Sequence, residues 1–424
     1  MTLPVAAEAP LSAPVVNRGA ALLSVTEACA RAVAHATTLT RTDIVPVMQA
    51  ADRTLAEPIV ARLAAPPFSQ SAMDGYALAV GDGLAAGARL EVVGRVPAGS
   101  RGGRIAAGQA ARLFTGAPLP EGADAVIMQE HVERDGSAII LRRTLRAGDN
   151  IRYKGEDIQP LEILLQAGER LDARHIALAA AQGIETLKMR ARPRVAVIST
   201  GDELRQVGDM LDPSTIFDSN RPMVLALIAQ SGLTPIDGGW VPDDPGAIAD
   251  RLRRMAEQAD LVITSGGASL GEEDHALAAL KRAGGSGEIL KIALKPGKPA
   301  VVGRIGAAAY LGLPGNPVSS LVCWLQLGQA MICTLEGRAP RRRLGFPLPS
   351  RSAFGRRAGR TEFVPARLVD DRDGLGVEIL GRGGSARLRP LAEADGLAEI
   401  ATENSGVLPS DIILFHPFRD GFAV

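Results

Sequence analysis

Cysteine is scarce in this chain of 424 residues, which has only Cys29, Cys323 and Cys333. None of them forms a CxxC pair, so the sequence indicates neither a disulfide framework nor a zinc knuckle. The five histidines are scattered as well, without an HExxH motif or a Cys/His cluster. We therefore expect any divalent metal ion to be bound by oxygen ligands, which is the preference of Mg²⁺.

The chain also lacks an excess of either charge. Lys+Arg and Asp+Glu total 47 each, which argues against a protein that holds nucleic acid by bulk charge. No run reaches the roughly 18–20 apolar residues of a membrane span. The first 20 residues lack the basic segment and apolar core of a signal peptide. We expect a cytoplasmic protein with a flexible tail at residues 1–20 that binds neither nucleic acid nor membrane.

Apolar residues make up 46% of the chain, enough for a substantial core, and the length suggests about two to four domains. Ser24 and Glu27 predict a capping box that begins an Ala-rich helix. Short apolar stretches between Gly and Pro predict a β-rich domain at residues 60–159. Helical segments on both sides of it predict that it is inserted into a discontinuous helical linker domain, residues 21–59 and 160–190.

From residue 191 to 338, short apolar strands alternate with helical segments. This order predicts an α/β domain with a mostly parallel sheet covered on both faces. A linker follows, and the short strands at residues 339–424 predict a small C-terminal β-barrel or sandwich domain. The predicted fold class is therefore a multidomain chain of α/β and β parts.

Three loops follow strands of the α/β domain, where open sheets bind ligands. Their sequences are "STGDEL", "TSGGASLGEEDH" and "GLPGNPVSS". In the second, Gly266 and Gly267 let the backbone approach a ligand and can form an anion-binding nest, although a plain turn is the alternative. In the third, Asn316 and Pro317 begin a helix whose N-terminus favours anions. Pro314 and Pro317 could equally serve only to shape that helix start.

Charged side chains occupy other loops. Lys291, Lys295 and Lys298 surround a Pro-Gly turn and suit phosphate or another oxyanion, although most lysine clusters are solvated. Five acidic residues each lie in a loop near glycine or proline, namely Asp74, Asp157, Glu203, Asp243 and Asp274. Mg²⁺ beside a pyrophosphate takes one or two carboxylates. Capping of a helix explains Asp243 equally well. A turn is as probable as a site for the loops around Asp74 and Thr115 and for the loop from Asn150 to Ile158.

Seven motifs occur in one order along the chain: "SAMDGYAL", "TGAPLPEGADAVIMQE", "NIRYKGEDI", "STGDEL", "SGGASLGEEDH", "KPGKP" and "GLPGNPVSS". Together they resemble the molybdopterin molybdenumtransferases of the bacterial MoeA type, which are related to the E domain of gephyrin. The resemblance covers about residues 20–424. It implies an elongated four-domain subunit in a homodimer, with a cleft shared between the α/β domain of one subunit and the β-rich domain of the other.

The resemblance also implies a reaction. The enzyme takes adenylylated molybdopterin, molybdate and Mg²⁺, and it yields molybdenum cofactor and AMP. An adenylyltransferase that supplies the substrate is a further implied partner. By position, the resemblance gives catalytic roles to Asp74, Thr115, Arg152, Asp157, Glu203, Asp243 and Asp274, of which Glu203, Asp243 and Asp274 would hold Mg²⁺. The implied substrate-binding residues are Ser265, Gly266, Gly267, Ser269, Lys291, Lys295, Lys298, Pro314, Gly315, Asn316 and Pro317.

Two other functions compete with this one. A molybdopterin adenylyltransferase or a CinA-like nucleotide hydrolase shares the α/β fold, but neither needs the SAMDGYAL segment or the C-terminal domain. A non-catalytic scaffold like the gephyrin E domain is the second alternative, and the full set of acidic and basic residues argues against it. The chain shows no Ser/His/Asp or Cys/His constellation, which is consistent with molybdate itself as the attacking group.

Overall fold

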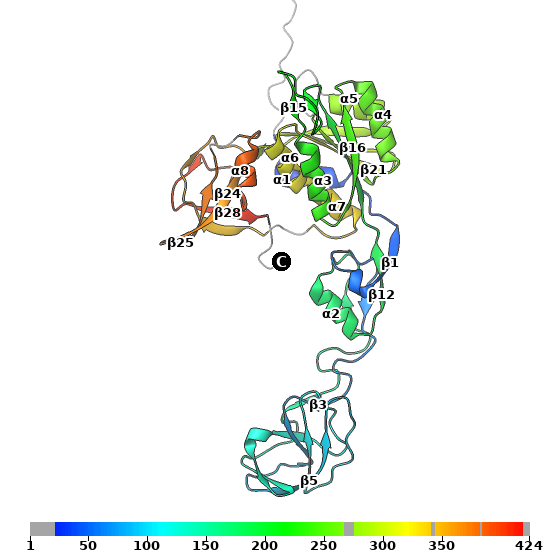
Figure 1. Ribbon diagram of the computed structural model, residues 1–424, viewed down its shortest axis with the longest axis vertical. Coiled ribbons are helices and arrows are strands. Elements are labelled where there is room, and N and C mark those ends of the chain that lie inside the picture. Colours follow the sequence, from blue (N-terminus) through cyan, green and yellow to red (C-terminus); the bar gives the residue numbers. More distant parts are fainter. Residues whose placement is uncertain (1–21, 267–274, 341–343, 382–383, 419–424) are drawn as a thin grey trace, which may run out of the picture. The chain divides into compact units, whose positions relative to one another are not determined.

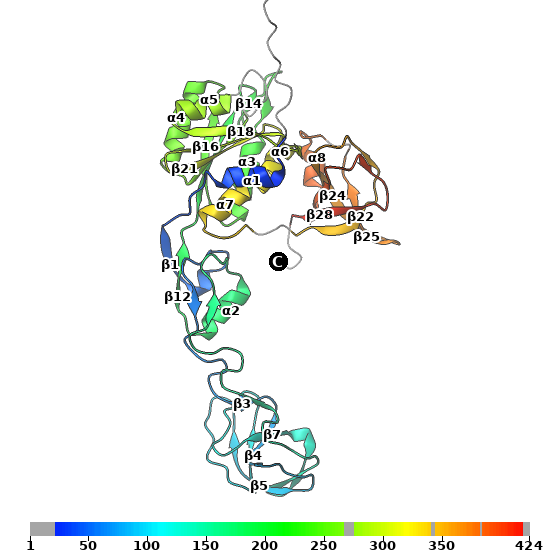
Figure 2. The ribbon, with the colours of Figure 1, turned by 180° about the vertical axis from the view of Figure 1, so that it is seen from behind.

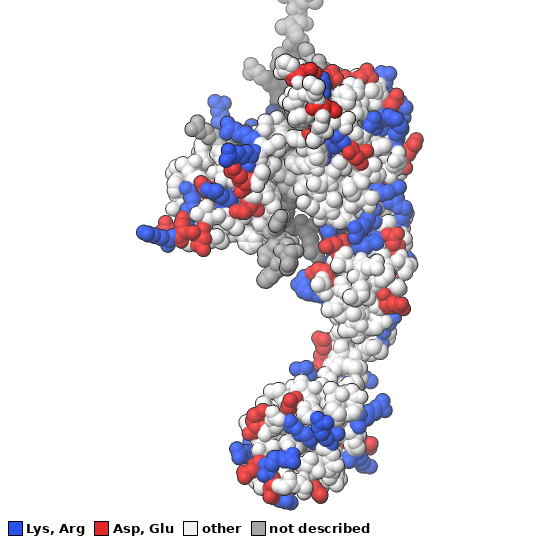
Figure 3. Space-filling view, in the orientation of Figure 1, with Lys and Arg blue, Asp and Glu red and all other residues white. Residues whose placement is uncertain are grey.

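The computed structural model describes residues 22–266, 275–340, 344–381 and 384–418. The chain divides into two compact units, coloured along the sequence in Figure 1. The first unit comprises Met1–Arg41 and Arg190–Val424, and the second comprises Thr42–Met189. Residues 1–20, the predicted tail, lie outside the described residues. Lys/Arg and Asp/Glu side chains are interspersed on the face of the molecule seen in Figure 3.

The first unit contains the predicted α/β sheet. Its strands follow the order β16 (Thr234–Val241), β13 (Arg194–Thr200), β17 (Leu261–Ser265), β21 (Ala308–Leu313), β20 (Pro299–Ile305) and β18 (Ser286–Lys291). The first four strands are parallel, and the last two are antiparallel to their neighbours. The prediction of a mostly parallel sheet is confirmed.

Helices cover both faces of this sheet (Figures 1 and 2). Val195 and Val197 point to one face, where they share a core with α1 (Val25–Val33) and α3 (Asn220–Gln230). Ala196 and Ile198, which alternate with them along β13, share a core with the helices of the other face. These helices are α4 (Pro245–Ala256) and α5 (His275–Arg282). Successive side chains of a strand point to opposite faces, so a strand buried on both faces is continuously apolar.

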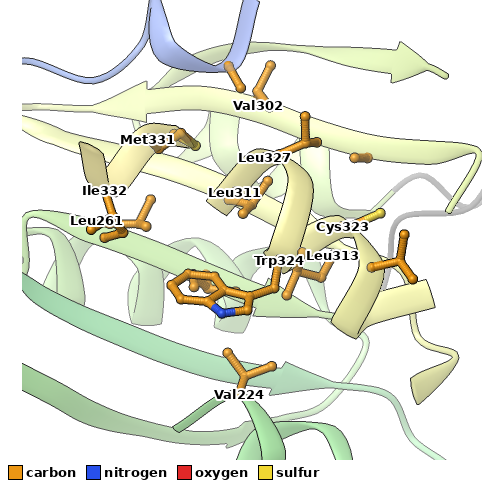
Figure 4. Packing of buried hydrophobic residues seen from close by; sticks show 14 of the residues in the cluster. Val224, Leu261, Val302, Leu311, Leu313, Cys323, Trp324, Leu327, Met331 and Ile332 are labelled. Atoms are coloured by element: carbon orange, nitrogen blue, oxygen red, sulfur yellow. The ribbon is translucent and has the colours of Figure 1, made fainter. Parts of the chain in front are cut away.

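The apolar helix that begins at Pro317 has three consecutive parts: α6 (Pro317–Cys323), the π-helical η3 (Trp324–Gly328) and α7 (Gln329–Leu335). Figure 4 shows Trp324 in the core formed by this helix and the sheet. A Cβ at Gly328 would lie 2.2 Å from the Trp324 ring, so only glycine admits the ring there. By length and a hydropathy of 1.5, Pro317–Leu335 could cross a membrane, contrary to the prediction from apolar runs, but 72% of it is buried inside the protein.

Helix α1 begins with the predicted capping box. The Glu27 N–H donates to Ser24 Oγ at 3.2 Å, and the Ser24 N–H donates to Glu27 Oε2 at 2.8 Å. The sequence prediction placed this helix in the linker domain with residues up to 59, whereas the structure groups it with the first unit. The physical reason is burial, because Ala28 and Ala32 are fully buried in the core that contains Leu335.

The C-terminal part of the first unit is a second sheet. Its strands follow the order β19 (Leu294–Lys295), β24 (Thr361–Asp371), β26 (Gly396–Ile400), β28 (Ile412–Pro417) and β22 (Phe346–Pro349), with β25 (Gly374–Ile379) beside β24. Strand β23 (Phe354–Gly355) pairs with β27 (Gly406–Val407), and α8 (Leu388–Ala392) is a short helix in this part of the chain. The first strand, β19, comes from the α/β part of the sequence, so residues 294 and 295 belong to the C-terminal sheet.

The second unit is built mainly of strands, as predicted for residues 60–159. Its largest sheet has the order β7 (Ala125–Met128), β4 (Gly75–Leu78), β6 (Gln109–Leu113), β5 (Arg89–Val96), β9 (Ala138–Leu141) and β8 (Val132–Asp135). The smaller pairs are β10 (Ile151–Arg152) with β3 (Gln70–Ser71), β11 (Ile163–Leu165) with β2 (Ile59–Val60), and β1 (Thr42–Pro46) with β12 (Thr186–Arg190). Helix α2 (Ala173–Ala181) packs in a separate core with the flanking segments.

Candidate functional site in two parts

Three strands of the α/β sheet end side by side. Ser199 on β13 is in register with Ser265 on β17, and Ser265 is in register with Leu313 on β21. Since parallel strands end at one edge, the three predicted ligand loops begin next to one another. Gly267, Ser269 and Asp274 lie outside the described residues, so their part in the site stays a prediction.

Gly266 has a backbone that only glycine adopts easily. Its φ is +102°, and a Cβ there would lie 2.3 Å from the Thr200 carbonyl oxygen. Its N–H donates to the Leu313 carbonyl at 3.3 Å. A Cβ on Gly315 would lie 3.8 Å from the Gly266 Cα, so these two loops approach through their glycines. Glycine therefore permits the close approach of these loops to one another, and the approach of Gly266 to a ligand stays a prediction.

Asn220 links two of these loops. Its Nδ2 donates to Ser265 Oγ at 2.8 Å and to the Gly315 carbonyl at 2.6 Å. The residue is 8% exposed, and its Oδ1 has no hydrogen-bond partner within the described residues. No side-chain hydrogen bond caps α3, so the Asn220 amide serves this link between loops. The sequence signal that was missed is an amide side chain at the first residue of α3.

A charged network around the buried Asp218 lies beside Asn220. Ser199 Oγ donates to Asp218 at 2.6 Å, and the Arg221 Nε donates to the same carboxylate at 3.1 Å. Arg221 also donates to both carboxylate oxygens of Asp237 at 2.6 Å. Burial opposes the guanidinium charge, but Asp237 and Asp218 outweigh it and raise the pKa of Arg221. This network fastens the segment before α3 to the sheet edge.

The start of α6 is partly occupied by the protein itself. Pro317 takes the first helical position, where its missing N–H costs no hydrogen bond. Asn316 is at the cap position without a side-chain cap bond, and its carbonyl accepts from Ser320 at 2.8 Å. The Val318 N–H donates to the Ser385 carbonyl at 2.9 Å, so it is not available to a ligand. A binding role for Pro314, Asn316 and Pro317 stays a prediction.

Two predicted metal ligands, Glu203 and Asp243, lie on neighbouring loops. The Asp243 N–H donates to Asp202 Oδ1 at 3.1 Å, which joins the loop after β16 to the loop after β13. Glu203 folds back over Gly201, where a Cβ would lie 2.5 Å from Glu203 Oε2. Neither the Glu203 nor the Asp243 carboxylate has a hydrogen bond or ion pair among the residues described. Two such carboxylates fit a Mg²⁺ ion that keeps several waters.

A complete metal cluster is not established. Within the described ranges, no group of three or more His, Cys, Asp or Glu residues could hold a metal ion. The third predicted ligand, Asp274, lies outside those ranges. The predicted Mg²⁺ site therefore stays a prediction that rests on two free carboxylates.

The three lysines surround one turn, as predicted. Lys291 on β18 is opposite Pro299 on β20, and the Ile292 N–H donates to the Lys298 carbonyl at 2.8 Å. Gly297 has a φ of +118°, and a Cβ there would lie 2.8 Å from Cys323 Sγ, so the turn packs on α6. Figure 4 shows Cys323 on this helix.

The ammonium groups of these lysines differ in their partners. Lys295 Nζ lies 2.8 Å from Glu362 Oε1 in the C-terminal sheet. Lys291 and Lys298 have no side-chain partner within the part of the chain that the structure describes. Two lysines are therefore free to meet an anion, and the third is already bound to a carboxylate.

The other predicted catalytic residues lie in the second unit. Asp74 Oδ1 accepts hydrogen bonds from the N–H and the hydroxyl of Thr115, both at 2.8 Å. These two bonds, with the nearby Arg112 charge, hold the pKa of Asp74 below its usual value. Arg152 is in register with Gln70, only four residues before Asp74. Asp157 lies farther along, where its N–H donates to the Ala65 carbonyl at 3.0 Å.

The sequence did not single out the guanidinium groups beside Thr115. Arg95 and Arg112 are in register on β5 and β6. Their guanidinium carbons lie 4.7 and 5.0 Å from the centre of the Phe114 ring. The sequence signal for these arginines was Phe114, which directly precedes Thr115 and Gly116 of the "TGAPLPEGADAVIMQE" motif.

The chain is similar to known proteins along most of its length. The chain matches "MoeA N-terminal region (domain I and II)" over residues 23–183, "Probable molybdopterin binding domain" over 196–332 and "MoeA C-terminal region (domain IV)" over 347–418. It is 35% identical to a molybdopterin molybdenumtransferase of Haemophilus influenzae, over 90% of this chain and 95% of that protein. The chain belongs to the MoeA family.

A further relative and a solved structure support the same family assignment. A molybdopterin molybdenumtransferase 2 of Mycobacterium tuberculosis is 34% identical over 87% of this chain and 93% of that protein. A crystal structure of the molybdopterin biosynthesis MoeA protein from Pyrococcus horikoshii has a TM-score of 0.79 and 26% identity, and covers 94% of this chain and 100% of that one. The sequence resemblance and the predicted fold class are confirmed. Matches on both sides of the central domain disfavour an adenylyltransferase or a CinA-like hydrolase.

Proposed function

We propose that this MoeA-family chain inserts molybdenum from molybdate into adenylylated molybdopterin, with Mg²⁺-dependent release of AMP. The observation that carries the transferase activity is the match to molybdopterin molybdenumtransferases along nearly the whole chain. Molybdenum transfer to molybdopterin follows from that match. Molybdate as the metal donor, the adenylylated form of the substrate and the need for Mg²⁺ are the further parts of the proposal.

The described residues suit cleavage of a pyrophosphate. Such cleavage needs negative charge neutralised on both sides of the bridging oxygen. Lys291, Lys295 and Lys298 supply positive charge from one turn. Glu203 and Asp243 would hold Mg²⁺, which supplies charge neutralisation at the phosphate oxygens when bound. Gly266 and the loop fastened by Asn220 let the backbone approach the ligand.

We also propose a homodimer in which each active site takes its β-rich part from the partner subunit. The membership in the MoeA family is what suggests this shared site, and the candidate residues are divided between the two units. Asp74, Thr115 and Arg152 belong to the second unit, whereas the strand-end loops and the lysine turn belong to the first. A cytoplasmic location and delivery of substrate by an adenylyltransferase complete the proposal.

The first experiment follows AMP release from adenylylated molybdopterin and Mg²⁺, with and without molybdate. The proposal expects molybdate-dependent release and a product that activates an apo-molybdoenzyme. Glu203→Gln and Asp243→Asn should raise the Mg²⁺ concentration needed for half-maximal rate, and Asp274→Ala should abolish turnover of a folded protein. Asp250→Asn is the matched control, because that exposed residue on α4 pairs, within the described ranges, only with Arg253. Tight binding without AMP release would favour a scaffold.

A second experiment tests the shared site. The variants Asp74→Ala and Asp274→Ala, each expected to be inactive and each altered in a different unit, are unfolded together and refolded as a mixture. If two subunits build each site, random pairing restores about a quarter of the wild-type activity, because half of the dimers then contain one intact site. If each site belongs to one subunit, the mixture stays inactive, and the shared-cleft proposal is wrong.

A further inference from the structure

The C-terminal sheet reaches the lysine turn directly. Strand β19 pairs in parallel with β24, with Leu294 opposite Thr361 and Lys295 opposite Glu362. The Thr361 N–H donates to the Ala293 carbonyl at 2.9 Å, which extends this pairing by one bond. The backbone that carries Lys295 is therefore held by the C-terminal domain, whose role the sequence left open.

Glu362 lies between two cations in this pairing. The residue is 2% exposed, and its Oε1 lies 2.8 Å from Lys295 Nζ. Its other oxygen lies 3.6 Å from Arg356 Nε, and the Arg356 side chain is 1% exposed. Arg356 is fixed independently, because its guanidinium donates to the carbonyls of Ile400 and Arg360. One partner of Glu362 is thus anchored in the C-terminal core, and the other belongs to the substrate turn.

The Glu362 carboxylate makes its shorter contact with Lys295 rather than with the buried Arg356. A buried carboxylate is costly unless cations and hydrogen bonds compensate it. Arg356 already supplies a buried counter-charge, yet the short contact of Glu362 is with Lys295, whose side chain is 42% exposed. Lys295 keeps two of its three ammonium donors for a ligand, since an ammonium has three and one serves Glu362. Glu362 Oε2 makes no hydrogen bond within the described residues.

We infer that Glu362 is a positioning residue for Lys295, so that the C-terminal domain takes part in binding the oxyanion substrate. A free lysine has a flexible four-carbon stem, and ordering it on binding costs entropy. The Glu362 carboxylate orders the ammonium in advance and directs its remaining donors to the turn. Glu362 acts through Lys295, and Arg356 holds Glu362 in place. This inference rests on the proposed function, in which the lysine turn binds molybdate or phosphate.

The test compares Glu362→Gln with wild type in molybdate binding, measured by calorimetry, and in steady-state kinetics. Loss of one charge-assisted contact should raise both the Kd and the KM for molybdate about tenfold, with kcat within about twofold. In a Lys295→Ala background, Glu362→Gln should have no further effect on either constant, because its action runs through Lys295. Additive effects, or tighter molybdate binding by Glu362→Gln, would overturn the inference.

The matched control is Glu378→Gln. Glu378 lies on β25 of the same sheet and pairs with Arg367 at 2.7 Å, so the variant removes the same charge from the same domain. Its molybdate constants should equal those of wild type. If Glu362→Gln does not fold, Glu362→Asp keeps the buried charge beside Arg356 but shortens the side chain. It should show the same rise in KM, and an unchanged KM would overturn the inference.

A readout without substrate separates this inference from the proposed function. Competitive acetylation of the folded protein, followed by mass spectrometry, reports how freely each lysine ammonium reacts. Glu362→Gln should raise the acetylation rate of Lys295 severalfold and leave that of Lys298 unchanged, whether or not wild type releases AMP. Equal rates for Lys295 in both proteins would overturn the positioning role. Failure of wild type to bind molybdate, with the acetylation change present, would count against the proposed function alone.

Discussion

The carboxylate of Asp74 is held by Thr115, whose backbone N–H and hydroxyl each donate to Asp74 Oδ1 at 2.8 Å. The two residues are 41 positions apart in the sequence. They meet because β4 pairs with β6, with Gly75 opposite Leu113. Donation to the charged form favours ionisation, so the pKa of Asp74 lies below its ordinary value.

The Asp74 pKa gives a first prediction. Thr115→Val removes the hydroxyl donor and keeps the N–H, so the pKa of Asp74 should rise toward its ordinary value of 3.8. Because the folded pKa is lowered, the stability from this pairing is present above pH 3.8 and lost as pH falls through the folded pKa. Carboxyl-carbon NMR titration measures the shift. Thr115→Ser keeps the hydroxyl and serves as control, and an equal pKa in both variants would contradict the prediction.

Gly266→Ala should lower activity about a hundredfold, since displacement of a ligand loop by about 1 Å is enough for a loss of that size. The added Cβ would meet the Thr200 carbonyl at 2.3 Å in a backbone with a φ of +102°. Gly306→Ala is a matched control, because Gly306 also has a positive φ, +57°, but nothing lies within 4 Å of its Cβ position. Rates of AMP release measure the effect. Similar rates in the two variants would mean that the close approach of Gly266 to the Thr200 carbonyl is not needed for activity.

Asp260→Asn should destabilise the first unit. Asp260 accepts hydrogen bonds from Arg41 at 3.0 and 2.8 Å and from the Arg194 N–H at 2.8 Å. Burial alone would raise its pKa, but these bonds outweigh burial and lower the pKa. We expect a loss of about 2 kcal/mol at pH 7, less than for a fully buried pair because both arginines are partly exposed. Urea unfolding measures it.

The control for this prediction is the exposed Asp250, whose replacement by Asn should change stability by less than about 0.5 kcal/mol. The pH dependence follows from the lowered pKa of Asp260. Its stabilisation is present above the unfolded pKa and is lost as pH falls through the folded pKa. Wild type and Asp260→Asn should therefore converge in stability at acidic pH, and a constant difference down to low pH would contradict this assignment.

Alkylation should distinguish the cysteines. Burial raises the pKa of the Cys323 thiol to about 12, so almost no reactive thiolate exists at pH 8. Cys29 is half-buried. Iodoacetamide should label Cys29 first in the folded protein and label Cys323 only after unfolding, as followed by peptide mass spectrometry. Rapid labelling of Cys323 in folded protein would show that the turn over α6 opens.

Residue types and spacing in the sequence predicted some features of the candidate site but not the long-range partners of its residues. The lysine turn was predicted as one cluster, and the structure gives it one backbone turn closed by the Ile292 to Lys298 hydrogen bond. The partner of Lys295 could not be predicted, because Glu362 is 67 residues away and meets it only through β19 and β24. The linking role of Asn220 could not be predicted for the same reason, since its partners Ser265 and Gly315 lie at the ends of other strands.

By itself, the sequence determined those features that depend on neighbouring residues or on period. The Ser24–Glu27 capping box spans three positions, and continuous apolar runs such as the one at Val195 predicted strands buried on both faces. Ordered motifs were enough to identify the MoeA family. The tertiary structure alone decided the Asp74–Thr115 pair, the Asn220 link and the place of β19 in the C-terminal sheet. These contacts join distant segments through strand register and burial, which no local pattern specifies.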